Sequence, residues 1–306
     1  MTLLHRCSAF VLGLGITVLA PLHPLRAQDL ENVEIETVPV AEGIYMLVGE
    51  GGNIGVSVGA DGGFLIDDQF APLTEKIQAA VSALGDAPIR FILNTHWHFD
   101  HTGGNENFGR AGVAIVAHDN VRERMSVEQF ISAFDRTFPA SPPEALPIVT
   151  FNDTVTFHLN GNTIHTLHVP PAHTDGDSIV HFLEADVIHT GDVYFNGFYP
   201  FIDIEHGGSI SGMISAADLV LEMADDTTQI IPGHGALSNR TELVAYREML
   251  VVVRDRTLAA IADGMSADDF IASNPTADLD AIWGNGFLKP EQFLRIVYGD
   301  LVRGNG

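Results

Sequence analysis

The chain has 306 residues, 46% of them hydrophobic, and its 40 acidic and 15 basic side chains give a net charge of −25. This length and composition suit one large α/β domain or two smaller ones, and they exclude a disordered or fibrous chain. The acidity argues against nucleic acid and anionic membrane surfaces as partners, because both would be repelled at long range.

Residues 1–27 have the layout of a secretory signal peptide. A short basic start precedes an apolar run over residues 9–20, and the small residue Ala27 offers a cleavage position. The run is too short to span a bilayer comfortably, which disfavours a retained membrane anchor. Cleavage would remove the only cysteine, Cys7, and leave a net charge of −27. We therefore expect a periplasmic or secreted protein whose mature part, residues 28–306, contains no disulfide.

The first part of the mature chain alternates between strand and helix patterns. Apolar alternation broken by glycines predicts several short strands, the last of which ends at Asp67. The strands are predicted within residues 33–69, 91–93 and 113–117, and the helices at 72–84 and 105–108. This alternation favours a layered α/β domain over a helical bundle or an all-β sandwich.

Residues 119–138 are predicted to form a helix, because Phe130, Phe134 and Phe138 recur at helical spacing. A proline-rich link follows at 139–147. Such an aromatic stripe usually belongs to the core. Since this segment interrupts the strand alternation, however, it is also the candidate for the walls of a substrate pocket.

The second part of the chain repeats the strand pattern and ends in helices. Strands are predicted at residues 155–159, 164–169, 179–183 and 187–188. From about residue 239 onward the pattern is helical, with helices expected over 239–262, from about Ser266, and over 290–302. These C-terminal helices are expected to pack on the sheet and show no residues of chemical interest.

The densest group of metal-binding side chains follows the apolar run 91–93. Within six residues the chain places His96, His98, Asp100 and His101. Ligands at every second or third residue of a turn can converge on a small volume, as a site for two neighbouring metal ions requires. A solvated histidine-rich turn is the alternative, but matching side chains at other strand ends make it much less favoured.

Three later turns each place one more potential ligand just after an apolar run. These are His173, Asp192 in the sequence Thr-Gly-Asp, and His234 in Pro-Gly-His-Gly. A rigid sheet can hold side chains at its strand ends in fixed geometry, which a metal site needs. Asp67 also ends a strand, where it could either form a turn or accept a hydrogen bond from a ligand histidine.

The series His96-x-His98-x-Asp100-His101, His173, Asp192 and His234 resembles the five-segment pattern of the metallo-β-lactamase superfamily of zinc hydrolases. The resemblance extends over roughly residues 38–240. It implies a four-layer αβ/βα sandwich of two similar halves, with two Zn²⁺ ions per chain in a cleft at one edge.

Carried over by position, the resemblance assigns each potential ligand to an ion. His96, His98 and His173 would hold the first zinc ion. Asp100, His101 and His234 would hold the second, and Asp192 would bridge the two. The remaining histidines match no ligand position and are expected in structural or surface roles, with His206 the least certain of them: His118, His158, His165, His168, His181, His189 and His206.

The types of ligand residue help to indicate which subgroup of this superfamily the chain resembles. The best-known secreted β-lactamases of this fold have a cysteine at the position of Asp192, usually lack a histidine at that of His101, and carry a lysine shortly after the cysteine. Here Val193-Tyr194-Phe195-Asn196 follows and contains no cation. The His and Asp set resembles instead that of lactonases and of thioester hydrolases of the glyoxalase II type, whereas the export signal and the context of His173 are β-lactamase-like.

The resemblance therefore implies a dinuclear zinc hydrolase that opens a cyclic amide or ester of a small-molecule substrate through a metal-bound hydroxide. A lactonase or thioesterase of broad specificity is the alternative. Asp100 would orient the water and carry its proton. Tyr194 could donate to the developing oxyanion, although a packed tyrosine is preferred.

A non-hydrolytic protein on the same ligands, either a metal-binding protein or an oxygen-reducing di-metal protein, is the alternative of another class. Redox-active di-iron members usually have an acid at the position of His98 and a flavin-binding partner domain, and neither is visible in the sequence. A nucleic-acid-processing enzyme is disfavoured by the charge and the export signal. The sequence says nothing of the oligomeric state.

Overall fold

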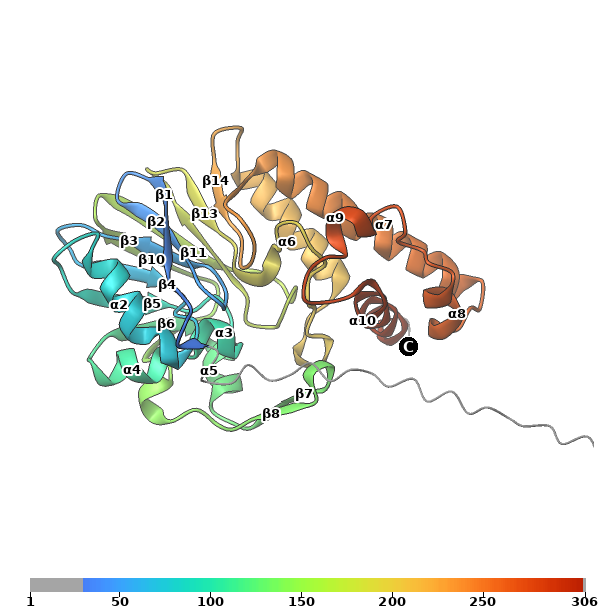
Figure 1. Cartoon of the computed structure of the whole chain (residues 1–306), viewed down its shortest axis with the longest axis horizontal. Helices are drawn as coiled ribbons and strands as arrows, with labels where there is room; N and C mark the ends of the chain where they lie inside the picture. Colours follow the sequence, from blue (N-terminus) through green and yellow to red (C-terminus); the bar gives the residue numbers. More distant parts are fainter. Residues whose placement is uncertain (1–29, 305–306) are drawn as a thin grey trace, which may run out of the picture.

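The computed structural model describes residues 30–304. Two mixed β-sheets lie face to face, and helices cover their outer faces (Figure 1). The expected signal peptide, residues 1–27, lies outside the described residues. Within the described range, no helix combines the length and the apolar character needed to cross a membrane.

The first sheet has seven strands in the order β1-β2-β3-β4-β5-β6-β9. Its first four strands form the antiparallel meander that the glycine-broken alternation predicts, and the strands from β4 onward run parallel to one another. The bounds are β1 Glu36–Ala41, β2 Ile44–Val48, β3 Ile54–Ser57, β4 Gly63–Ile66, β5 Ile89–Leu93, β6 Ala114–His118 and β9 Val149–Phe151.

The second sheet has six strands in the order β10-β11-β12-β13-β14-β15. Neighbouring strands are antiparallel except β13 and β14, which are parallel because α6 connects them. The bounds are β10 Thr154–Leu159, β11 Asn162–His168, β12 Ser178–Phe182, β13 Val187–His189, β14 Gln229–Ile231 and β15 Ser238–Asn239.

The period of two along each strand divides the core into layers. In β4, Phe64 and Ile66 face the second sheet and pack with residues such as Phe182, whereas Leu65 packs toward the helices of the first half. Each of these fully buried side chains contributes about 1.5–3 kcal/mol relative to exposure. Helices α2 (Thr74–Ser82) and α4 (Asn105–Arg110) cover the first sheet, and α6 (Ile210–Met223) and α7 (Arg240–Ala262) cover the second. The four-layer αβ/βα sandwich is thereby confirmed.

The C-terminal helices begin where the sequence predicts. Asn239 accepts a hydrogen bond from the amide of Glu242 and caps α7, and Ser266 caps α8 through the amide of Asp269. Helix α6 is absent from the sequence-based prediction, although Ser209 caps it in the same way. The remaining helices of this part are α8 Ala267–Ala272, α9 Asp280–Trp283 and α10 Pro290–Arg303.

The predicted helix over residues 119–138 is wrong beyond its first two turns. Helix α5 ends at Met125, where the hydroxyl of Ser126 donates to the carbonyl of Arg122. The chain then forms a hairpin, which reverses at Asp135 in the left-handed region with φ 47°. A phenylalanine at every fourth residue fits the alternation of a strand as well as a helical turn. The elements are α5 Asp119–Met125, β7 Gln129–Ile131, the 3-10 turn η2 Ser132–Phe134, and β8 Arg136–Phe138.

Candidate metal centre

All seven side chains that the sequence singles out lie together at one edge of the sandwich. His96, His98, Asp100 and His101 follow β5, the last two within the short helix α3 (Phe99–Thr102). The other three follow strands of the second sheet: His173 after β11, Asp192 after β13 and His234 after β14. The site therefore stands on loops from both sheets.

Three histidines and one carboxylate form the first set of potential ligands. One nitrogen from each of His96, His98 and His173 and one oxygen of Asp192 lie within 4.8 Å of one another, and all four residues are buried. Three imidazoles with a carboxylate can complete a tetrahedral site for zinc.

The second set consists of Asp100, His101 and His234, whose ligand atoms also lie within 4.8 Å of one another. The side chains of Asp100 and His234 are 22% and 19% exposed, whereas those of the first set are at most 5% exposed. Asp100 and His234 therefore lie on the solvent side of the centre, whereas His101 is fully buried.

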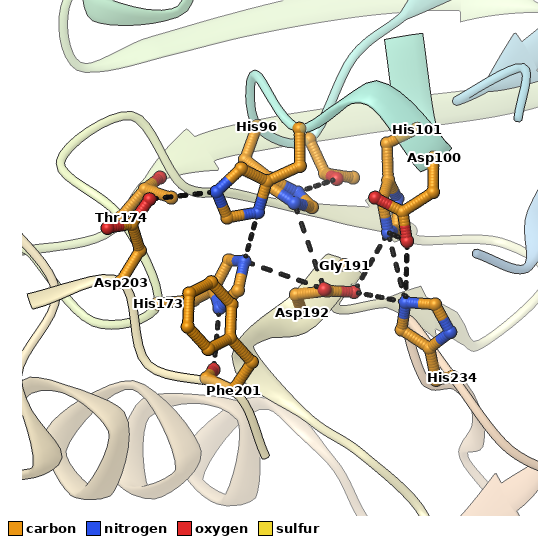
Figure 2. Close-up of polar contacts among 12 residues, drawn as sticks. His96, Asp100, His101, His173, Thr174, Gly191, Asp192, Phe201, Asp203 and His234 are labelled. Carbon is orange, nitrogen blue, oxygen red and sulfur yellow. Dashed lines mark hydrogen bonds and ion pairs between the residues drawn. The ribbon is translucent and has the colours of Figure 1, made fainter. Parts of the chain in front are cut away.

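Asp192 lies between the two sets, as Figure 2 shows. Its Oδ2 is 3.8 Å from Nε2 of His96 and 3.5 Å from Nε2 of His173. Its Oδ1 is 3.1 Å from Nε2 of His101 and 3.5 Å from Nε2 of His234. One carboxylate oxygen faces each set, which is the placement that a bridging ligand needs.

Four of the five histidines are oriented through the nitrogen that points away from the centre. Nε2 of His98 lies 2.9 Å from Asp203, and Nδ1 of His101 lies 2.8 Å from Asp67. Nδ1 of His173 lies 2.8 Å from the carbonyl oxygen of Phe201. Carboxylate and carbonyl oxygens only accept here, so each of these nitrogens carries a proton. In the neutral tautomer this leaves the partner nitrogen, which faces the centre, with a lone pair.

His96 follows the same rule through Thr95. The hydroxyl of Thr95 donates to Asp67 at 2.7 Å, so its oxygen is left to accept from Nδ1 of His96 at 3.1 Å. Asp67 therefore accepts a hydrogen bond from a ligand histidine, His101, and its φ of 65° also fits the turn-forming role. Asp67, which follows β4, is thus linked by hydrogen bonds to Thr95 and His101, which follow β5.

The inward-facing atoms suit a cation. Nδ1 of His98 and Nε2 of His173 are 2.8 Å apart and both present lone pairs. Nε2 of His96 and Oδ1 of Asp192 are buried without a hydrogen-bond partner. Buried polar atoms of native proteins are normally satisfied, and bound divalent ions would satisfy all of these at once. The donor set therefore fits two metal ions.

Histidines of the two sets have pKa values shifted in opposite directions, down for His96 and His173 and up for His101 and His234. Burial lowers the pKa of His173 to about 4, and burial with the neighbouring His101 lowers the pKa of His96 well below its usual value. Burial also opposes charge on His101 and His234, but Asp192 and Asp100 outweigh it. They raise the pKa of His101 well above the usual value and that of His234 to about 9. His96 and His173 are therefore ready to coordinate, and metal binding at His101 and His234 would release protons.

Two glycines lie in van der Waals contact with the centre. A Cβ on Gly52 would lie 2.1 Å from Cε1 of His101, and a Cβ on Gly233 would lie 2.1 Å from Oδ1 of Asp192. Any side chain at either position would displace one of the potential ligands. The glycine loop 49–53 is therefore part of the centre.

Asp203 is a functional candidate that the sequence does not reveal. It lies in the loop after β13, is 1% exposed, and accepts hydrogen bonds from both His98 and His206. Burial opposes its charge, but these hydrogen bonds hold its pKa well below the usual range. No motif spacing marks it, because its role depends on how its loop folds back over His98.

We expect Asp203→Ala to lower zinc affinity by about 10- to 100-fold, because His98 would lose the acceptor that fixes its tautomer. Competition with a zinc indicator measures this affinity. Asp268→Ala, a change at an exposed ion pair on α8, serves as the control. Equal zinc affinity in the two variants would contradict the role of Asp203.

Among the remaining histidines, His118, His168 and His189 have structural contacts, as does Tyr194. His118 and His168 stack with ring centroids 3.8 Å apart, and His189 is bonded to the carbonyl oxygen of Asn53. The hydroxyl of Tyr194 is hydrogen-bonded to Ser238 and its ring is fully buried. Tyr194 is therefore a packed tyrosine, which is the role preferred for it from the sequence. His206 is hydrogen-bonded to Asp203, which also accepts a hydrogen bond from the potential ligand His98.

A family model described as the metallo-beta-lactamase superfamily matches residues 48–234. This match covers more than half of the chain and includes all seven potential ligands. The chain therefore belongs to the metallo-β-lactamase superfamily, as its sequence motifs imply.

Among curated proteins, the chain is similar to a hydroxyacylglutathione hydrolase of Polaromonas sp., with 26% identity over 180 residues, 58% of this chain and 60% of that protein. It is similar to the acyl-coenzyme A thioesterase MBLAC2 of Gallus gallus, with 24% identity over 49% of this chain and 57% of that protein. It also resembles a hydroxyacylglutathione hydrolase of Rhodospirillum rubrum, 31% identical over 40% of this chain and 41% of that protein. The chain thus spans 60% or less of these relatives' length.

Solved structures show the same fold. A metallo-beta-lactamase from Pontibacter korlensis superposes with a TM-score of 0.58 and 17% identity, covering 71% of this chain and 99% of that one. The DIM-1 metallo-beta-lactamase superposes with a TM-score of 0.56 and 18% identity, covering 72% and 98%. At this identity the likeness concerns the fold alone. Both matches leave more than a quarter of this chain uncovered.

Proposed function

We propose that the chain is a dinuclear zinc hydrolase that cleaves an ester or thioester bond of a small molecule. The observation that carries this proposal is the placement of Asp192, with one oxygen toward each set of potential ligands. Two bound divalent ions would polarise a carbonyl oxygen and lower the pKa of a shared water toward about 7. The names of the curated relatives, a hydroxyacylglutathione hydrolase and an acyl-coenzyme A thioesterase, support the choice of bond.

In this proposal His96, His98 and His173 would hold the first ion, and Asp100, His101 and His234 would hold the second. Asp100 also has a catalytic role. Burial raises its pKa, but His101 and His234 outweigh burial and lower it to about 2, so the carboxylate stays ionised near neutral pH. An ionised carboxylate at the exposed side of the centre can orient the attacking water and accept its proton.

A cyclic amide, including a β-lactam, is the second candidate substrate. The same two sets of ligands could serve a carbonyl in a strained ring, and Asp100 could return its proton to the departing nitrogen. A thiolate or alkoxide leaves more readily than an amide nitrogen. Residues 193–196, which follow Asp192, also contain no cation, whereas the best-known secreted β-lactamases of this fold carry a lysine shortly after that position. For these reasons we propose the ester and thioester ahead of the cyclic amide.

The test is a hydrolysis panel on zinc-loaded protein with a thioester, an acyl-homoserine lactone, a cephalosporin and a phosphodiester. We expect turnover of the thioester or lactone and none of the phosphodiester. A chelator should abolish turnover, and added zinc should restore it. Failure to hydrolyse any carbonyl substrate, or isolation of the protein with iron and oxygen-dependent chemistry, would overturn the proposal.

We also propose that the protein acts outside the cytoplasm, on the basis of residues 1–27, and that it has no nucleic-acid partner, on the basis of its charge. Both follow from the sequence alone. N-terminal sequencing of the protein from a periplasmic or culture-medium fraction tests the first. A start at or near Gln28 is expected, and an intact N-terminus in the cytoplasmic fraction would contradict it.

A further inference from the structure

The hairpin β7–β8 borders the metal centre. Its turn is fixed because the amide of Ser132 donates to Glu205 at 3.0 Å. The ring of Phe134 packs on Phe201 with centroids 5.0 Å apart, and Phe201 in turn packs on His98 and on His173, each at 5.8 Å. This part of the hairpin therefore lies over the first set of potential ligands.

Arg136 begins the second strand of the hairpin and lies against the loop that carries His98 and Asp100. Its guanidinium carbon is 5.0 Å from the centre of the Phe99 ring and 4.7 Å from that of Phe138. The two rings stack on each other with centroids 4.7 Å apart. Phe99 stands in the chain between His98 and Asp100, so Arg136 contacts the ligand loop itself.

The surroundings of Arg136 leave its hydrogen-bond donors available. Within residues 30–304, six arginines form ion pairs with carboxylates: Arg110, Arg124, Arg247, Arg254, Arg256 and Arg295. Arg136 is exposed, and its contacts in this part of the chain are the two aromatic rings. Ring faces hold a guanidinium without occupying its N–H groups. In a chain of net charge −25, such a cation is conspicuous.

The surface between Arg136 and the metal centre includes the apolar rings of Phe99 and Phe70. The rings of Phe70 and Phe99 are 5.8 Å apart. A Cβ on Gly51 would lie 3.2 Å from the Phe70 ring and 2.7 Å from the carbonyl oxygen of Asp100. The Phe70 ring and the glycine loop therefore meet beside Asp100, on the more exposed side of the centre.

We propose that Arg136 binds a carboxylate of the substrate, while an apolar part of the substrate lies against Phe99 and Phe70. This inference rests on the proposed function, since it supposes that the bond to be cleaved lies at the metal centre. A guanidinium binds a carboxylate through two parallel hydrogen bonds, which fixes orientation as well as position. The substrates would be esters, thioesters or cyclic amides that also carry a free acid.

Matched substrates test the proposal. On a thioester with a free carboxylate, Arg136→Ala should raise KM by about 10-fold with little change in kcat, because one charge-assisted contact is lost. On the methyl ester of that acid, the variant should equal the wild type. Arg136→Lys should recover part of the effect, and Arg295→Ala, an exposed arginine paired on α8 and α10, should change neither substrate. Equal effects of Arg136→Ala on the acid and its ester, or none on either, would overturn the proposal.

A binding measurement separates this inference from the proposed function. Calorimetry on the zinc-loaded protein should show phenylacetate binding about 5- to 10-fold more weakly to Arg136→Ala than to wild type, with no such difference for phenylacetamide. If this difference appears but no panel substrate is hydrolysed, the proposed function is wrong and carboxylate binding by Arg136 is supported. If hydrolysis occurs and phenylacetate binds both proteins equally, carboxylate binding by Arg136 is wrong and the proposed function is supported.

Discussion

Asp192→Ala is expected to lose the second metal ion and to lower kcat/KM by about 1,000-fold or more. The carboxylate is the one described group that faces both sets of potential ligands, with Oδ1 3.1 Å from His101 and Oδ2 3.5 Å from His173. Metal ions contribute several kcal/mol to transition-state stabilisation in hydrolases, and each 1.36 kcal/mol is a factor of about ten in rate. Elemental analysis and kcat/KM on the best panel substrate measure the two effects.

The control for Asp192→Ala is Asp218→Ala, which removes a carboxylate paired with Arg247 on the outer helices. This variant should keep both metal ions and wild-type turnover, because surface ion pairs contribute little. A purified Asp192→Ala protein that retains two metal ions and full turnover would show that the bridging role is wrong.

Gly52→Ala is expected to have the second largest effect, about 100-fold in kcat/KM, with loss of metal from the second set. The new methyl group would lie 2.1 Å from the ring of His101. That ring cannot easily retreat, because Asp67 holds its Nδ1 at 2.8 Å. The loop is also held, since Gln69 donates to the carbonyl oxygen of Gly52 at 2.7 Å. A displacement of about 1 Å at a reacting centre can cost a factor of about 100.

Gly85→Ala is the matched control for Gly52→Ala. A Cβ at Gly85 would meet its nearest neighbour, Val58, at an ordinary 3.7 Å. Both variants are to be compared by thermal unfolding without metal, zinc content and kcat/KM. If Gly52→Ala binds zinc and turns over substrate as Gly85→Ala does, the loop has more freedom than its contacts indicate.

The fold and the membership of the site could be predicted because both depend on local signals. Strands carry a period of two, and a ligand placed just after a strand inherits the position of that strand in the sheet. This is why His173, Asp192 and His234, far apart in sequence, could be assigned to one centre. The distances now place them together, while their binding of zinc stays a prediction.

The surroundings of the site could not be predicted in the same way. His173 is oriented by the carbonyl oxygen of Phe201, a group that every residue possesses and that no pattern marks. Asp203 reaches His98 across 105 positions in the sequence. The sequence predicts a helix where the hairpin β7–β8 carries Arg136, because phenylalanines four residues apart fit both the helical period and the period of two of a strand. Long-range contacts decided each of these features.

The placement of the potential ligands on both sheets has a mechanical consequence. The inner layer between the sheets is held by dispersion and hydrophobic contacts, which any pair of complementary faces could make. Ions bound by both His101, from the first half, and His234, from the second, would cross-link the two halves at the edge of the sandwich where the metal centre lies. Binding energy gained there is folding energy for the whole sandwich. Zinc would therefore also set how tightly the two halves of the molecule stay closed.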